Sequence, residues 1–574
     1  MKISKLILIV ALGCFLVSCE DVLNKTDLTA ISEDAVWDDL ELATAYVSEI
    51  YDNNLPGWDL GVADHSDESD EGESYMYGQL TENSVNTWNY SGIRAINILL
   101  TSIDKGTLNG PDKNRLKGEA FFFRAWSYFD MVRLYGGVPL ILEPQKLTDD
   151  LFVKRAPTSV VMNQIISDLD SAIANLPVIK ATNSTENVGR VNRGTAMAMK
   201  GRVLLYYASP QFDPSQTASG RWQAAYNANK EAKDFLIAQD YGLYANFKNI
   251  WITEMNKEVL FVRRYEYPLK PDPVHWSAAT RPLDVSQGAA GRNQPVLEMI
   301  NAFPMKDGRA IDDLTSSYTY DPMYFWKNRD PRFQATIVYN GCLWELNGAK
   351  GRIQWTFIGS ESNSPTETGF YCKKAVDENF DGEKAYNSAT DYVELRFAEV
   401  LLNLAEAANA IGNTSEAYDE LKAIRARAGI DPGTDNLYGL NAGMNKAQMQ
   451  DAIILERKIE MAFEGKRYWD LRRNRMFEGL LNGTRRHGYN VELLIPKDDF
   501  DDIVSSMPSA LLLDHLATNY TTYFKHTLVE RDIQFTINWK PEYYFFAIPT
   551  SHLELNSNLE QTLGWSGGTF DPLE

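Results

Sequence analysis

The stretch that decides the fold runs from Gly118 to Leu140 and reads GEAFFFRAWSYFDMVRLYGGVPL. Between Glu119 and Asp130, apolar residues cover nearly every face of a helix. A surface helix carries one apolar stripe, whereas a helix that is apolar all round is buried. The segment therefore predicts an interior helix.

Helical periodicity continues on both sides of this stretch. Apolar residues recur at helical spacing in the segments 36–50, 162–176 and 196–206. Pro177 ends the second segment, and Asn192 can cap the start of the third. Helices are thus expected through most of the N-terminal half.

The C-terminal half predicts paired helices. Segments 393–411 and 415–428 are separated by a short Gly-Asn-Thr turn, Gly429 is placed to end the second, and 449–469 supplies another helix. Such pairs favour an α-solenoid like tetratricopeptide repeats. No clean consensus of about 34 residues is present, so any repeats are degenerate.

Two regions break the helical pattern. Residues 265–390 are rich in Pro, Gly, Asn and Trp, and 59–78 is polar and acidic. Long irregular segments on a regular scaffold usually carry function, so a ligand is expected there. The acidic pairs Asp67-Glu68 and Asp70-Glu71 are interpreted as a solvated loop.

Composition limits the possible functions of the 574-residue chain. With 44% hydrophobic and 23% charged residues it is neither disordered nor fibrous. The formal net charge of −22 repels phosphate backbones, so we expect no nucleic-acid partner. Aromatic residues make up 12% of the chain, more than a core needs, which indicates rings exposed for binding.

Motifs for metal and enzyme chemistry are weak. The four cysteines form no CxxC pair, and the six histidines form no HExxH motif. GxSxG at 564–568 has no His after it, which excludes a serine hydrolase site. Asp377, Asn379 and Asp381 resemble half of an EF-hand, so a structural calcium site is a minor alternative to a simple turn. No cofactor or resident metal is expected.

The first residues form a predicted targeting segment. Lys2 and Lys5 precede an apolar run over 6–17 that is too short to span a bilayer. The run ends in Leu-Val-Ser-Cys, which resembles a bacterial lipobox. Residues 1–18 are therefore a predicted signal peptide, and Cys19 is the predicted lipid-modified N-terminus. Glu20-Asp21 resembles the surface-export signal of Bacteroidetes lipoproteins.

Six segments in order along the chain resemble the SusD/RagB family of outer-membrane nutrient-binding lipoproteins. The opening stretch is similar to the family's EARFLRAYYYFDLVRLYGDVPL. The other matching segments are 189–203, the Arg-Asp-Pro-Arg turn within 328–333, 395–407, 456–473 and 547–561. The last departs from the family pattern at Ser557 and at Thr562-Leu563.

The resemblance implies a mainly α fold, in which four degenerate tetratricopeptide-like helix pairs pack against an irregular ligand-binding half. It implies one SusD-like domain over 19–574, with a helical part at 19–265, an irregular insertion at 266–390 and a second helical part at 391–574. Charged motif residues are interpreted as scaffold pairs between helices. These residues are Arg124, Asp130, Arg457, Glu460, Glu464 and Arg467.

The family also implies a function. Such a protein is lipid-anchored at the outer membrane, faces the exterior, and binds a glycan that it delivers to a SusC-like TonB-dependent transporter. Family binding residues follow no fixed motif, so our candidates come from aromatic and polar residues in the irregular regions, with ordinary packing as the alternative for each. The candidates are Trp58, His65, Tyr75, Tyr77, His275, Trp276, Arg281 and Trp355.

Two other functions remain open from sequence. One is a peptide-binding lipoprotein subunit of a similar importer. The other is a surface glycoside hydrolase, whose paired carboxylates need a separation that sequence does not give. The preferred hypothesis is glycan binding without chemistry, for which no catalytic residue is needed.

Overall fold

A computed structural model describes residues 33–58, 62–70, 74–181, 188–272, 291–360, 366–379 and 388–574. Cys19, the predicted signal peptide, His275, Trp276, Arg281 and Asp381 lie outside these ranges. The helices of the N-terminal half are α3 (Glu33–Val36), α4 (Leu40–Asn54), α5 (Tyr90–Ser102), α6 (Gly110–Tyr135), α7 (Thr158–Asn175), α8 (Arg193–Ala208) and α9 (Ser219–Ala238).

The remaining helices follow the middle of the chain. Two short ones lie within the predicted insertion, and the others form the C-terminal half. They are α11 (Leu297–Ala302), α12 (Pro331–Thr336), α13 (Phe397–Ala410), α14 (Thr414–Ala428), α15 (Lys446–Glu460), α16 (Arg467–Arg473), α17 (Phe477–Leu480), α18 (Lys497–Ser506), α19 (Ser509–Tyr523) and α20 (Thr550–Leu555).

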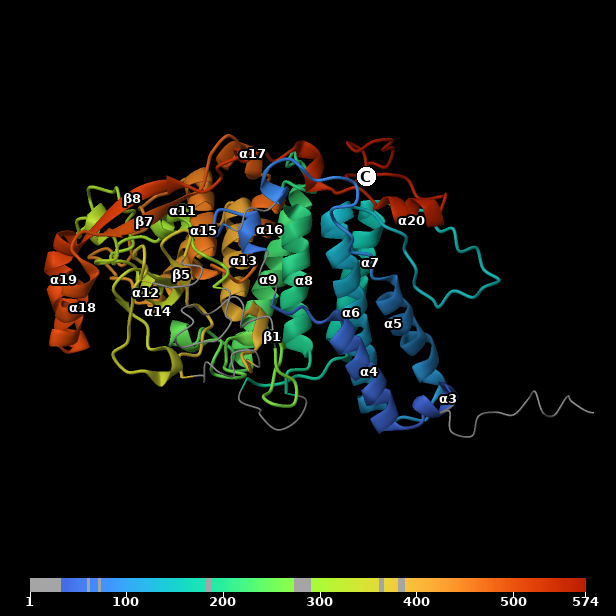
Figure 1. Ribbon diagram of the computed structural model, residues 1–574. Helices are drawn as coiled ribbons and strands as arrows, with labels where there is room; N and C mark the ends of the chain where they lie inside the picture. The colour runs from blue at the N-terminus through green and yellow to red at the C-terminus, as the bar shows by residue number, and fades with distance from the viewer. Residues whose placement is uncertain are drawn as a thin grey trace, which may run out of the picture.

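Consecutive helices pack as pairs, and the pairs form a row (Figure 1). Helix α6 packs on α7, α8 on α9, and α13 on α14, while α7–α8 and α9–α13 contacts join neighbouring pairs. The mainly α prediction is confirmed. This arrangement is compatible with degenerate tetratricopeptide-like repeats.

Helix α6 is the interior helix that its sequence predicts. Phe122, Phe123 and Tyr128 are fully buried, because α4, α5 and α7 all pack against α6. Asn109 caps its start by accepting the backbone N–H of Asp112 at 3.0 Å. Gly136 follows its end at φ 75°, a conformation that disfavours residues with a Cβ atom.

The described strands form four antiparallel pairs. These pairs are β1 (Val259–Arg263) with β6 (Tyr392–Arg396), β2 (Ile337–Val338) with β5 (Tyr371–Cys372), β3 (Cys342–Leu343) with β4 (Ile353–Gln354), and β7 (His487–Leu493) with β8 (Phe524–Glu530). The β7–β8 hairpin carries α18 and α19 between its strands, at the end of the molecule opposite α3 (Figure 1).

Two predictions for the C-terminal half were wrong in detail, and one element was missed. Residues 393–396 belong to strand β6, because they pair with β1 instead of continuing α13 backwards. The predicted helix 449–469 is broken between α15 and α16, where Phe463 and Gly465 have φ of 58° and 70°. The β7–β8 hairpin was not predicted.

A buried ionic network joins the elements around α15. The Glu460 carboxylate accepts Arg332 Nη1 at 2.8 Å and Arg396 Nη1 at 2.6 Å, and it also pairs with Arg427. Arg332 in turn binds Asp330 of the Arg-Asp-Pro-Arg turn and Glu456 of α15. The network therefore ties α12, β6 and α14 to α15.

The other charged motif residues are also paired. Arg124 of α6 binds Asp168 of α7 at 2.7 Å, and Arg457 of α15 binds Asp470 of α16 at 2.8 Å. Glu464 and Arg467 pair with Arg396 and Asp67, whereas Asp130 pairs within its own helix with Arg133. The interpretation as pairs between helices is confirmed for Arg124, Arg457 and Glu460, whereas Glu464 and Arg467 pair with a strand residue and a loop residue, and Asp130 joins no second element within the described ranges.

Replacing Arg332 tests the network. Arg332→Ala leaves Asp330, Glu456 and Glu460 short of a buried partner, so we expect a loss of about 3–5 kcal/mol in the free energy of unfolding. Urea denaturation measures it. The control Lys180→Ala removes an exposed pair with Asp240 and should cost about 1 kcal/mol or less. Equal losses in the two variants would contradict this account.

Candidate ligand-binding site

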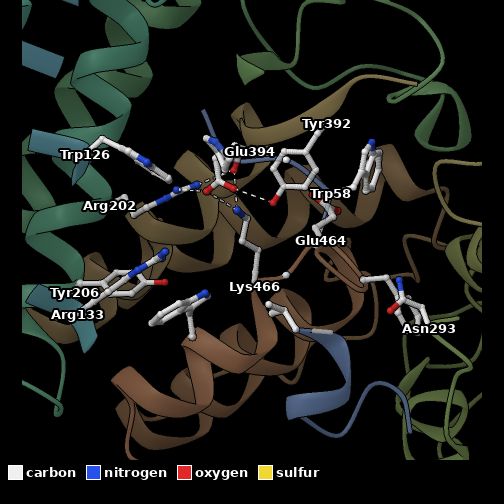
Figure 2. A pocket seen from close by; sticks show the side chains of 16 residues that line it. Trp58, Trp126, Arg133, Arg202, Tyr206, Asn293, Tyr392, Glu394, Glu464 and Lys466 are labelled. Carbon is white, nitrogen blue, oxygen red and sulfur yellow. Dashed lines mark hydrogen bonds and ion pairs between the residues drawn. The ribbon is translucent and has the colours of Figure 1, made fainter. Parts of the chain in front are cut away.

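A pocket of about 250 Å³ lies where the N-terminal helices meet the C-terminal half. Helices α6 and α8 form one side, β6 and the segment after α4 form the other, and residues 463–469 complete it (Figure 2). The middle of the chain contributes Asn293. Segments far apart in the sequence thus build one hollow.

Trp58 and Tyr392 form the first aromatic wall. Their ring centroids are 5.2 Å apart in an edge-to-face arrangement. The Trp58 indole Nε1 donates to the backbone oxygen of Thr390 at 3.1 Å. This bond holds the segment after α4 against the start of β6, so the Trp58 ring is fixed at the pocket.

The opposite wall carries Trp126 of α6, Tyr206 of α8 and Trp469 of α16. The Arg133 guanidinium lies 3.7 Å from the Trp469 ring centroid, which is a close cation–π contact. Figure 2 shows Trp126 and Tyr206 across the pocket from Tyr392.

Charged side chains lie between these walls. Glu394 Oε1 accepts Arg202 Nη1 at 2.5 Å and Lys466 Nζ at 2.7 Å, and Oε2 accepts the Tyr392 hydroxyl at 3.0 Å (Figure 2). Burial alone would raise the pKa of Glu394, but the charges of Lys466 and Arg202 lower it to about 2. Glu394 is therefore ionised at every physiological pH.

Of the predicted ligand residues that the structure describes, Trp58 lines this pocket. His65 and Tyr75 stack on each other with centroids 3.9 Å apart and pack against Tyr468. Burial, together with the charge of Arg486, lowers the pKa of His65 to about 4. The pair is thus neutral and engaged in packing.

Tyr77 and Trp355 lie elsewhere. The Tyr77 hydroxyl donates to Asp532 Oδ1 at 2.5 Å. Trp355 packs edge-to-face on Phe500 and also contacts Phe524, in the aromatic cluster beside α18 and α19. The structure does not bring these two side chains to the pocket around Trp58.

The comparisons with known proteins match this architecture. A family model described as "SusD family" matches residues 248–565, more than half of the chain. The chain belongs to the SusD family. A second model, described as "Starch-binding associating with outer membrane", matches residues 28–205 of this SusD-family chain.

Individual relatives have low sequence identity to this chain but match it over most of their length. SusD-like protein P38 of Formosa agariphila is 24% identical over 83% of this chain and 92% of its own length. A solved SusD-like protein from Bacteroides fragilis has a TM-score of 0.74 at 24% identity, covering 94% of this chain and all of that one. A SusD-like carbohydrate-binding protein from the same species gives 0.70 at 20% identity, with 91% and 99% covered. At these identities the solved structures support the fold alone.

Sequence reasoning missed five aromatic residues of the pocket in this SusD-family protein, namely Trp126, Tyr206, Tyr392, Phe463 and Trp469. Trp126, Tyr206 and Trp469 lie on helices, within or beside segments whose pattern predicts burial. Nothing in that pattern separates a ring that faces a hollow from a ring in the core. Size gives no signal either, because Trp37, Trp344 and Trp539 of the same chain are at most 1% exposed.

The solvated-loop interpretation was wrong for Asp67, Glu68 and Asp70, while Glu71 lies outside the described residues. The first three residues are 5%, 1% and 5% exposed. Asp67 binds Lys458 at 2.9 Å and Arg467 at 2.8 Å, and Asp70 binds Arg531 at 2.8 Å. Asp67 and Asp70 are stable in the interior because cations of the C-terminal half pair with them.

Glu68 supports the pocket from behind. Its Oε1 accepts the backbone N–H of Phe463, a residue of the pocket wall, at 3.0 Å. Its Oε2 is buried and has no hydrogen-bond partner among the described residues. Burial, aided by the charge of Asp67, raises the pKa of Glu68 to about 7.

The predicted calcium segment shows a simple turn where it is described. Asp377 Oδ1 accepts the backbone N–H of Asn379 at 3.0 Å. Asp381 lies outside the described residues. Within the described ranges, no group of three or more His, Cys, Asp or Glu side chains is placed to hold a metal ion.

Glu68 predicts a pH dependence of stability. The pKa of Glu68 in the folded state, about 7, exceeds its ordinary value of 4.5, so the protonated carboxyl stabilises the fold. This contribution to the free energy of unfolding is complete below pH 4.5 and is lost as pH rises through 7. Between about pH 5 and pH 8 the parent should lose about 2–3 kcal/mol more than Glu68→Gln, which does not ionise. Urea titrations across this range measure the difference.

His65 and His526 titrate in both proteins, so their contributions cancel in this comparison. Parallel stability profiles for the parent and Glu68→Gln would show that the Glu68 carboxyl titrates as it does in water.

Proposed function

We propose that this chain binds a carbohydrate in the pocket around Trp58 and passes it, chemically unchanged, to a SusC-like TonB-dependent transporter. The observation that carries the proposal is a ring-lined hollow in a SusD-family chain. Flat aromatic rings stack on the apolar faces of sugar rings. Trp58, Trp126 and Trp469 supply such rings around a space of about 250 Å³.

The names of similar proteins support carbohydrate as the ligand class. One matching family model is described as starch-binding. One solved relative is named a carbohydrate-binding protein, and another, with a TM-score of 0.56 at 21% identity, is named laminarin-binding. The proposal carries this ligand class over to the present chain.

The state of the pocket carboxylates supports binding without catalysis. A glycosidase needs one carboxylic acid that is protonated near neutral pH. Burial alone would raise the pKa of both Glu394 and Glu464. The charges of Lys466 and Arg202 nevertheless lower the pKa of Glu394, and those of Arg396 and Lys374 lower the pKa of Glu464. Both groups are held as paired carboxylates, which do not donate a proton.

We place the protein at the outer membrane through a lipid on Cys19, facing the exterior. The lipobox-like Leu-Val-Ser-Cys sequence and the description "associating with outer membrane" support this location. Among the described residues, no helix is both long enough and apolar enough to cross a bilayer. In this proposal residues 266–390 remain the ligand-binding insertion, and Asn293 lines the pocket among its described residues.

Removing the stacking ring tests the binding site. We expect Trp58→Ala to weaken glycan binding by about 1–3 kcal/mol, which is the range of aromatic hot spots. Isothermal titration with the tightest ligand from a glycan array measures the loss. Trp355→Ala removes an indole outside the pocket and serves as the matched control.

A peptide pool screened beside the array tests the alternative ligand class. Binding of peptides but of no glycan would replace the carbohydrate proposal with the peptide-importer hypothesis. Release of shortened sugars by the purified protein would instead indicate an enzyme.

The lipid anchor predicts a second phenotype. Cys19→Ser removes the thiol that would be acylated, so the protein should leave the membrane fraction and become soluble in the periplasm or medium. Fractionation followed by immunoblotting measures this. Unchanged membrane attachment of the Ser variant would refute the anchor.

A further inference from the structure

Three side chains of the pocket present hydrogen-bond donors that are unused. Trp126 and Tyr206 are 7% and 4% exposed and line the hollow. Among the described residues, the Trp126 indole N–H, the Tyr206 hydroxyl and the Trp469 indole N–H make no hydrogen bond. None of these atoms is among the unpartnered polar atoms sealed from solvent. Burial raises the pKa of Tyr206 to about 12, so its hydroxyl keeps its proton.

The side-chain acceptors of the pocket are engaged or sealed, since Asn293 Oδ1, which has no partner among the described residues, is closed off from solvent. Both oxygens of Glu394 accept bonds from Arg202, Lys466 and Tyr392. Glu464 accepts Lys374 Nζ at 2.6 Å on one oxygen and Arg396 Nε at 2.8 Å on the other. A ligand group that donates a hydrogen bond would therefore find few vacant acceptors in the pocket. A ligand group that accepts hydrogen bonds would find free donors.

The charges of the pocket residues also favour a ligand group that accepts hydrogen bonds. Three cations and two carboxylates line the pocket, although the whole chain carries −22. Arg133 bonds Asp130 through Nε and Nη2, which leaves Nη1 without a partner in the described part of the chain. The exposed edge of Arg133, stacked on Trp469, is thus available to an anion.

We propose that the pocket recognises an acidic sugar unit through its anionic oxygen group, either a uronic acid carboxylate or a sulfate ester. Such a group offers several acceptor oxygens and no donor, which matches Trp126, Tyr206, Trp469 and Arg133. Hydrogen bonds to charged groups are about twice as strong as neutral ones. This inference rests on the proposed carbohydrate function and specifies the class of sugar.

Ligand pairs that differ in the acidic group alone test the proposal. Polygalacturonate is compared with its carboxyl-reduced form, and a sulfated galactan with its desulfated form, by tryptophan fluorescence titration of the full-length protein. We expect at least one acidic member to bind about tenfold more tightly than its neutral partner, because charged pairs are the stronger bonds. The pair that responds identifies carboxylate or sulfate.

Two conservative variants locate the interaction. Tyr206→Phe and Trp126→Phe each delete a donor and keep a ring, so each should weaken the acidic ligand about tenfold, as loss of a bond to a charged group does. Tyr207→Phe is the matched control, because its hydroxyl faces Arg221 away from the pocket. Thermal melts of all three variants verify folding.

The outcomes separate this inference from the function on which it rests. Equal binding of acidic and neutral partners, or undiminished acidic binding in both Phe variants, overturns the acidic-sugar proposal and leaves carbohydrate binding intact. Failure of the parent to bind any polysaccharide of the two pairs or any glycan of the array overturns both.

Discussion

The carboxylate of Glu460, held between three arginines, is the interaction on which the rest of this structure depends. Arg332, Arg396 and Arg427 reach it from three different segments, and all four side chains are buried. Burying one of these charges alone would be prohibitive, so the segments are stable when they meet together. The position of β6 follows from this meeting, and with it the position of Glu394 in the pocket.

The fold could be predicted to a large extent from sequence, because helical periodicity reports burial directly. Helix α6 was predicted from its apolar faces, the Asn192 cap was correct, and Gly429 ends α14 at φ 83°. The α15–α16 break was missed because the single Gly465 is a weak breaker within a helical pattern. The ion pair of Glu464 with Arg396 of β6, which holds the residues between the two helices, cannot be read from sequence. Strand β6 was missed because its residues also fit a helical pattern.

The site was predicted less well for a physical reason. A pocket depends on which sides of distant elements face one another, and sequence spacing contains no such distance. Trp58 was found because it lies in an irregular segment, whereas Trp126 and Trp469 look like ordinary helix residues. Asp67 and Glu68 were misjudged because their buried partners, Lys458 and Phe463, are nearly four hundred positions away.

The walls of the pocket come from parts of the chain that span most of its length, from Trp58 to Trp469. A fragment that lacks any of these parts lacks a wall of the pocket. The proposed ligand binding is therefore a property of the complete fold, and a partly unfolded chain would have no binding site. A bound ligand, in turn, would favour the complete native state over every partial one, which couples ligand supply to the lifetime of the folded protein.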